Sequence, residues 1–310
     1  MRLKDSMTKS SRYRLSFALL LAGSVVVGWH ALAATFSLAL RNDEYTHLLL
    51  ILPVSVALII LELPSLQALV APNIRVGSVL LAMAVLGAGL AQVRSASLPA
   101  DVLLSIRMFA LVLFWIGSIV LCLGSQVARS LLFPLCFLFW LVPFPQVVLA
   151  EVVKLLQQGS ALSAHALFAA AGVPVARDGV MLTVPGLTIQ VASECSSIRS
   201  SSMLLVTTMA LAQVLLRSPW RKALVIAIAV PLSVVKNGLR IFTIAMLGIR
   251  VDPGYLTGRL HHQGGIVFFA AALGMVFAMI HLLKRGEDRA LSNAALTPAS
   301  ASCESGVPLA

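Results

Sequence analysis

Three clusters of polar residues interrupt long apolar stretches, and each holds a group that could take part in chemistry. In the first cluster, Cys195 follows Glu194 and precedes Arg199 by four residues. A nearby guanidinium and a helix N-terminus both favour a thiolate over a thiol, which makes a cysteine more nucleophilic. The pattern indicates Cys195 as a candidate nucleophile, with Glu194 and Arg199 in support.

The second cluster contains Lys236, Asn237 and Arg240 at helical spacing. Two cations one turn apart within a membrane repel each other, so they require an anionic partner, a carbonyl-lined cavity or a substrate that develops negative charge. Glu194 is a candidate for that partner. Arg240 is therefore a candidate stabiliser of an oxyanion, supported by Asn237. The alternative is that Lys236 and Arg240 are anchors that snorkel to the membrane surface.

The third cluster is the pair His261 and His262. A histidine can take and return a proton near neutral pH, whereas histidines at an interface can also simply contact lipid headgroups. The residues leave open which of the two would act as the base. A cysteine, an arginine and a histidine together provide a nucleophile, an oxyanion stabiliser and a base, the parts needed for acyl transfer through a thioester.

The elements that must position these groups are membrane helices. The chain of 310 residues is 59% hydrophobic and only 11% charged, with a mean hydropathy of +0.96, which excludes a soluble domain. A spanning helix needs about 20 apolar residues. The sequence predicts an all-α polytopic membrane protein with about eight such spans: 15–38, 46–63, 76–93, 102–122, 130–149, 196–216, 222–248 and 264–283.

Charge sets the predicted topology and domain organisation. The net charge of +11 comes from basic residues placed between apolar stretches, which argues against a nucleic-acid surface and for cytoplasmic retention of the basic loops. We predict a basic cytoplasmic N-terminus over 1–14, a transmembrane domain over 15–285 and a disordered cytoplasmic tail over 286–310. A cleavable signal peptide ending near Ala31-Leu32-Ala33 is an alternative for the first segment that leaves the later topology unchanged. All three polar clusters then face the outer side.

The longest predicted non-spanning segment, 150–194, lies on the same outer side. A weakly amphipathic pattern predicts a small interfacial helix at its start. From Val180 to Ala192, alternating and β-branched residues around Pro185-Gly186 predict a β-hairpin. This insertion leads directly into Cys195, before the sixth span.

Taken together, these segments resemble the exosortase family of membrane cysteine transpeptidases, which process exported proteins with a PEP-CTERM sorting signal. The resemblance covers most of the chain and rests on several elements in the right order. They are Asp43-Glu44-Tyr45-Thr46-His47, Phe133-Pro134-Leu135 through Pro143-Phe144-Pro145, Gly172-Val173-Pro174-Val175, Glu194-Cys195-Ser196-Ser197-Ile198-Arg199-Ser200, Asn237-Gly238-Leu239-Arg240-Ile241, and His261 with Gly265-Ile266-Val267-Phe268-Phe269.

The resemblance implies roles for the site residues. Cys195 would be the nucleophile, Arg240 the oxyanion stabiliser and His261, four residues before Gly265, the base, with His262 as the remaining alternative. It also implies a bacterial inner-membrane protein whose outer face, including the helix and hairpin insertion, is periplasmic. No metal or organic cofactor is expected, since the sequence has no H-E-x-x-H helix, P-loop or G-x-S-x-G element.

The implied substrate is an exported protein that ends in a proline-containing motif, one membrane helix and a basic cytoplasmic end. The enzyme would cleave this tail and transfer the protein to a cell-envelope, lipid-linked or exopolysaccharide acceptor, or to water. The expected partners are therefore such proteins, the acceptor and membrane lipids, and no nucleic acid.

Two other functions remain open from the sequence. In the first, a transporter or assembly subunit of a polysaccharide export system binds an anionic substrate through Arg199, Lys236 and Arg240. In the second, a membrane glycosyltransferase or acyltransferase uses carboxylates, of which only Glu62, Glu151 and Glu194 lie near the membrane.

Overall fold

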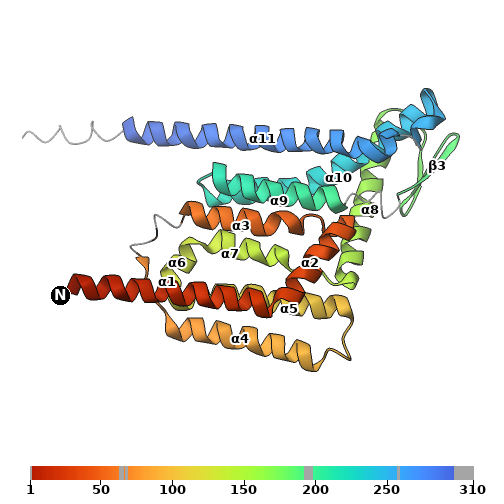
Figure 1. Cartoon of the computed structure of the whole chain (residues 1–310). Helices are drawn as coiled ribbons and strands as arrows, with labels where there is room; N and C mark the ends of the chain where they lie inside the picture. The colour runs from red at the N-terminus through yellow and green to blue at the C-terminus, as the bar shows by residue number, and fades with distance from the viewer. Residues whose placement is uncertain (1, 63–65, 67–68, 192–197, 257–258, 297–310) are drawn as a thin grey trace, which may run out of the picture. The chain divides into compact units, whose positions relative to one another are not determined.

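The computed structural model describes the whole chain except residues 1, 63–65, 67–68, 192–197, 257–258 and 297–310 (Figure 1). The chain forms two compact units, unit 1 over Met1–Val153 and unit 2 over Lys154–Ala310. Every residue that the sequence predicts for the reaction belongs to unit 2. The fold of unit 2 therefore has most bearing on the site.

The predicted all-α polytopic architecture is confirmed: the described residues include six single helices and two bent helix pairs that are long and apolar enough to span a membrane. Counting each bent pair as one span gives eight, which matches the number predicted. Many large apolar side chains on these helices are exposed, as in α4 (Ile74–Val93), where Leu86 and Val93 are 71% and 80% exposed. Side chains of this kind suit a lipid environment, which makes no demand for a polar outer surface.

Unit 1 contains α1 (Arg2–Val27), α2 (Trp29–Arg41), η1 (Asp43–Tyr45), α3 (Leu48–Glu62), α4, α5 (Ala100–Cys122), α6 (Ser125–Ser130), α7 (Leu132–Phe137), η3 (Leu138–Leu141) and the start of α8 (Gln146–Ala170). The first bent pair is α1 with α2, which meet at 65° around Gly28. The second is the α7–η3 segment with α8, at 99°.

The bend before α8 occurs at Pro143 and Pro145, which lack the backbone N–H needed to continue a helix. Their segment is held by hydrogen bonds from other helices. The Ser105 hydroxyl donates to the Pro143 carbonyl at 2.7 Å, and the Tyr45 hydroxyl donates to the Phe144 carbonyl at 2.9 Å. The Tyr45 element thus fixes the start of α8. The predicted span over 130–149 ends earlier than expected because these prolines stop it, and the predicted small helix is a 25-residue one.

The insertion before Cys195 is a three-stranded antiparallel sheet of order β1-β2-β3 rather than the predicted two-stranded hairpin. The expected hairpin corresponds to β2 (Met181–Val184) and β3 (Leu187–Gln190), and the additional strand is β1 (Ala176–Asp178). β1 was missed because three residues without a buried position carry no alternating signal. One face of the sheet packs on α8 and α10, where Leu182 and Val184 are almost fully buried.

The rest of unit 2 consists of α9 (Ile198–Leu215), α10 (Pro219–Arg250), η5 (Pro253–Leu256) and α11 (Arg259–Leu296). The three helices pack along a shared apolar seam that includes Leu204, Val225, Ala272, Val276 and Ile280. Figure 1 shows them running side by side. They correspond to the sixth, seventh and eighth predicted spans.

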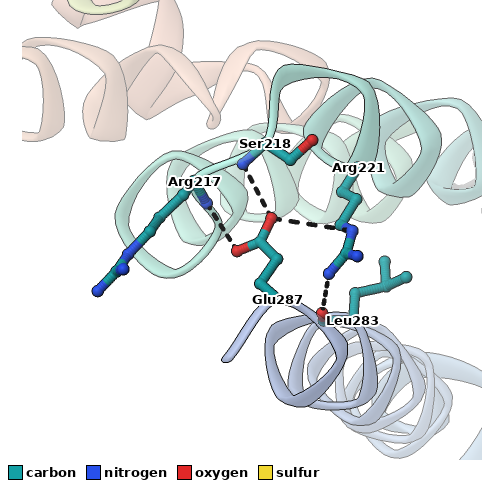
Figure 2. A network of polar contacts seen from close by, with 5 residues as sticks. All are labelled: Arg217, Ser218, Arg221, Leu283 and Glu287. Atoms are coloured by element: carbon teal, nitrogen blue, oxygen red, sulfur yellow. Dashed lines mark hydrogen bonds and ion pairs between the residues drawn. The ribbon is translucent and has the colours of Figure 1, made fainter. Parts of the chain in front are cut away.

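The helix α11 continues well beyond the end of its predicted span, and this corrects the predicted disordered tail for residues 286–296. A polar network lies at the start of this extension (Figure 2). Glu287 is only 7% exposed, and its carboxylate accepts the backbone N–H groups of Arg217 and Ser218 at 3.0 and 2.8 Å. Arg221 lies 4.0 Å from the same carboxylate and donates to the Leu283 carbonyl. This network fixes α11 to the turn between α9 and α10.

Candidate functional site

The predicted site residues lie on or next to the three helices of unit 2. Glu194 and Cys195 lie outside the described residues, in the connection between β3 and α9. Arg199 is in the first turn of α9, Lys236, Asn237 and Arg240 are in α10, and His261 and His262 are in the first turn of α11. The geometry of the site is therefore built from what holds these helix segments together.

The chain is anchored immediately before the segment that contains Cys195. Val191 is 1% exposed, its N–H donates to the Val180 carbonyl at 3.0 Å, and its carbonyl accepts a hydrogen bond from the Gln157 amide of α8 at 3.1 Å. After the segment, Ile198 is buried as α9 begins. Only six residues separate these two buried positions. The chain is therefore held to the body of unit 2 at Val191 and again at Ile198.

Lys236 connects α10 to the first turn of α9. Its side chain is 4% exposed and its ammonium donates to the Ser200 hydroxyl. Arg199, next to Ser200 in the sequence, is exposed. The burial of Lys236 shows that this cation is not a snorkelling anchor, because an anchor would carry its ammonium to the membrane surface.

Asn237 and Gly238 connect α10 to α8. The Asn237 side chain is 1% exposed, and its amide donates to the Ser160 hydroxyl at 2.9 Å. A Cβ on Gly238 would lie 2.5 Å from Cβ of Ser163 and 2.9 Å from the backbone nitrogen of Ala164. Only glycine permits such a close approach, since any side chain there would force the two helices apart.

Arg240 points from α10 to the beginning of α11. Its guanidinium lies 3.8 to 3.9 Å from where a Cβ on Gly265 would be. The neighbouring Ile241 packs instead against the sheet and α8, in the cluster that contains Leu182 and Val191. Residues 236 to 241 therefore contact α9, α8, α11 and the sheet in turn. This short stretch of α10 is the structural centre of the site.

The position of Arg240 distinguishes the two histidines. Residues four apart in a helix share a face, so position 261 lies on the face of Gly265 and position 262 on the face of Ile266. Gly265 is the residue beside the Arg240 guanidinium, whereas Ile266 is 72% exposed. The backbone of α11 therefore places position 261 on the side facing Arg240 and position 262 on an exposed side.

The structure also identifies supporting residues that sequence reasoning did not assign to the site. Ser160 and Ser163 of α8 contact Asn237 and Gly238, Gln157 anchors Val191, and Ser200 receives Lys236. A signal was present for Gln157 alone, because it belongs to the weakly amphipathic pattern of Glu151, Lys154, Gln157 and Gln158. That pattern was interpreted as a helix lying in the headgroup region, whereas the Gln157 amide donates to the Val191 carbonyl at the end of the sheet.

Comparison with known proteins gives one result. A model of the transmembrane exosortase family (Exosortase_EpsH) matches residues 29–278, which include every predicted site residue. No curated protein and no solved structure matches the chain.

Proposed function

The chain belongs to the transmembrane exosortase family, and on that premise we propose that it is a membrane-embedded cysteine peptidase or transpeptidase that removes the C-terminal sorting tail of exported proteins. The observation that carries this proposal is the proximity of the Arg240 guanidinium to Gly265, one turn after His261. It places a cation beside the helix turn that follows the proposed base. The proposed nucleophile lies in the sequence between Val191 and Ile198, both of which are buried.

In the proposed reaction, His261 takes the proton of the Cys195 thiol and the sulfur attacks a peptide carbonyl of the tail. The carbonyl oxygen becomes an oxyanion, which accepts hydrogen bonds from the Arg240 guanidinium. The C–N bond then breaks, His261 returns the proton to the leaving amine, and the tail departs with its membrane helix. The exported protein remains as a thioester on Cys195.

A second nucleophile resolves the thioester. A hydroxyl or amine of a cell-envelope or exopolysaccharide acceptor gives the transferred product, and water gives the free acid. His261 removes the proton from the attacking group, and Cys195 leaves as the thiol. Since the polar clusters lie on the predicted outer side, the reaction takes place at the periplasmic face of a bacterial inner membrane.

Arginine suits the proposed role of Arg240. An arginine guanidinium offers several hydrogen-bond donors in a fixed plane. The contacts of Asn237 and Gly238 with α8 hold the helix turn that carries it. Donors that are fixed before the reaction stabilise developing charge without further reorganisation.

The test of the proposed function is loss of the tail from a secreted reporter fused to C-terminal tails of exported host proteins, followed by gel shift and mass spectrometry. We expect the wild-type protein to cleave at least one fusion, Cys195→Ala to cleave none, and the matched control Cys136→Ala to cleave as wild type. A thioester between reporter and Cys195 should be trapped in the wild type. Cleavage by Cys195→Ala at the wild-type rate contradicts the cysteine mechanism.

The two histidines provide a second, paired test. His261→Asn should reduce cleavage by about 10²- to 10⁴-fold, the usual contribution of a general base. His262→Asn should stay within about threefold of wild type because its position shares the face of the exposed Ile266. The opposite result would assign the base to His262.

A transporter or assembly subunit of a polysaccharide export system is the second candidate, and the burial of Lys236 one turn from Arg240 favours it. Two cations directed into a helical unit could bind an anionic substrate. Under this function, Cys195→Ala retains polysaccharide export and Arg240→Ala abolishes it. Under the peptidase function, both substitutions stop tail cleavage.

A further inference from the structure

The strand β3 is an edge strand that leads directly toward the proposed nucleophile. Within the described residues the sheet has the order β1-β2-β3, so β3 pairs on one side only. Its side chains alternate between half-buried Leu187 and Ile189, which pack toward α8 and α10, and exposed Thr188 and Gln190. Cys195 follows Gln190 by five residues.

The hydrogen-bond pattern shows which backbone groups of β3 face its open edge. In an antiparallel ladder, alternate residues direct both their N–H and C=O at the same neighbouring strand. The Val191 N–H bonds to the Val180 carbonyl, and Ile189 is the register partner of Leu182. Residues 187, 189 and 191 therefore bond toward β2. The N–H and C=O groups of Thr188 and Gln190 point away from β2, along the open edge.

The two edges of the sheet differ in charge. β1 has three exposed residues, of which Arg177 and Asp178 are charged. Short, charged edges discourage the addition of another strand. The edge of β3 carries Thr188 and Gln190, which are uncharged, and threonine has a high preference for strands. Of the two edges, only that of β3 is suited to receive a further strand.

We propose that the segment of the substrate around the cleavage point binds in an extended conformation along β3, as an added strand that pairs with the backbone of Thr188 and Gln190. This inference rests on the proposed peptidase function and names how its substrate is held. In strand addition, the peptide is bound mainly through backbone hydrogen bonds. Such a site binds many different sequences, provided that the peptide is extended.

The geometry connects strand addition to the reaction. Five residues of extended chain reach at most about 18 Å, so Gln190, the last residue of the paired segment, lies within that distance of Cys195. Val191, directly after β3, is fixed by Val180 and Gln157. An added strand is therefore aligned by the same element that carries the chain to the nucleophile. A scissile bond a few residues beyond the paired segment would be presented to the Cys195 sulfur.

Proline substitutions on the two edges test the inference. Thr188→Pro removes an N–H that faces the open edge of β3 without removing a bond to β2, and its ring obstructs an incoming strand. Arg177→Pro makes the matched change on β1. Residues 176 and 178 direct their backbone groups at β2, so the N–H of Arg177 between them faces the outer edge of β1. On a fusion that the wild type cleaves, we expect Thr188→Pro to be about tenfold slower and Arg177→Pro to remain within twofold.

Disulfide cross-linking provides a measurement that does not depend on the proline variant folding. In a protein with Cys195→Ala and its other three cysteines replaced by alanine, Gln190→Cys is combined with single cysteines scanned along the substrate tail. Neighbouring strands bring side chains on one face within the range of a disulfide, and side chains alternate between faces. We expect cross-links at every second substrate position with Gln190→Cys, and none with Arg177→Cys.

The outcomes separate this inference from the proposed function. If Cys195→Ala stops cleavage but Thr188→Pro cleaves as wild type, and cross-links are absent or show no alternation, the strand-addition inference is wrong and the peptidase function stands. If Cys195→Ala does not affect cleavage, the proposed function is wrong.

Discussion

Polar contacts join the helices α9, α10 and α11 in two places, and these contacts differ in kind. At the first place, here called the Glu287 end, the buried Glu287 carboxylate meets two backbone N–H groups and Arg221 beside the turn between α9 and α10 (Figure 2). At the second place, here called the Lys236 end, the buried Lys236 ammonium meets the neutral hydroxyl of Ser200 in the first turn of α9, and Arg240 lies one turn further along α10.

This difference in charge compensation suggests that one end serves stability and the other serves function. A buried charge that meets complementary donors offsets much of its cost of desolvation. A buried cation bonded to a hydroxyl offsets less of it, and charges kept at such a cost within a membrane are usually functional. We therefore expect changes at the Glu287 end to lower stability with little effect on cleavage, and changes at the Lys236 end to lower cleavage with little effect on stability.

Among these variants, Arg240→Lys should lower the rate of cleavage most. A small effect would contradict the proposed difference between the two ends. Lysine keeps the charge but loses the planar set of donors, so cleavage should fall by about 10²-fold, within the range seen when an oxyanion donor is removed. The midpoint of thermal unfolding in detergent should change by no more than about 2 °C. The measurement is the rate of tail loss together with the unfolding curve.

The control for this substitution is Arg250→Lys, at the exposed end of the same helix. It should leave both rate and unfolding unchanged. If Arg240→Lys cleaves at the wild-type rate but unfolds at a markedly lower temperature, Arg240 is a structural residue and both ends of the helices serve stability.

Much of this arrangement could be predicted from the sequence. Long apolar segments bounded by basic residues predicted the number and order of the spans, because the length of a spanning helix is fixed by membrane thickness. The extension of α11 could not be predicted, since it depends on Glu287 meeting backbone groups about 70 residues earlier in the chain. No local pattern contains that information.

Part of the candidate site could be recognised from the sequence for similar reasons. Lys236, Asn237 and Arg240 are unusual inside an apolar span, because burying a polar or charged group in a membrane costs free energy unless a partner compensates for it. Their partners Ser160, Ser163 and Ser200 could not be recognised, since serine is common and costs little wherever it occurs. The choice of partner depends on which faces of α8, α9 and α10 meet, and this is decided by packing across the whole unit.

Glu287→Ala should give an intermediate effect, on stability alone. The substitution leaves the backbone N–H groups of Arg217 and Ser218 without their acceptor and removes the partner of Arg221. We expect a loss of about 1–2 kcal/mol in the free energy of unfolding, which lowers the unfolding midpoint by a few degrees. Glu287→Gln, which keeps an acceptor oxygen, should lose less than half as much.

Cleavage by Glu287→Ala should stay within twofold of wild type at a temperature where the variant is folded. Glu287 is 22 residues from Gly265, or about 33 Å along α11 at the rise of an α-helix. A large loss of cleavage with intact folding would show that the Glu287 contacts set the position of the first turn of α11. The two ends would then act together rather than separately.

Lys236→Met should have the smallest effect in free energy of the three substitutions. It tests directly whether the buried ammonium serves the reaction or stability. Methionine fills a similar volume without a charge, and replacing a poorly compensated buried charge by an apolar group is often neutral or stabilising. We therefore expect the unfolding midpoint to stay the same or rise. Cleavage should fall by about fivefold, since a unit charge near a developing oxyanion contributes on the order of 1 kcal/mol at the effective dielectric of a protein site.

The matched control is Lys222→Met, because Lys222 lies in the first turn of the same helix and also donates to a neutral oxygen, that of Gln213 at 2.8 Å. This variant should cleave at the wild-type rate. A Lys236→Met protein that is less stable but equally active would mean that the ammonium holds α10 to Ser200 for structural reasons. One that is at least as stable but slower would show that unit 2 keeps a buried cation beside Arg240 for the reaction and at the expense of its own stability.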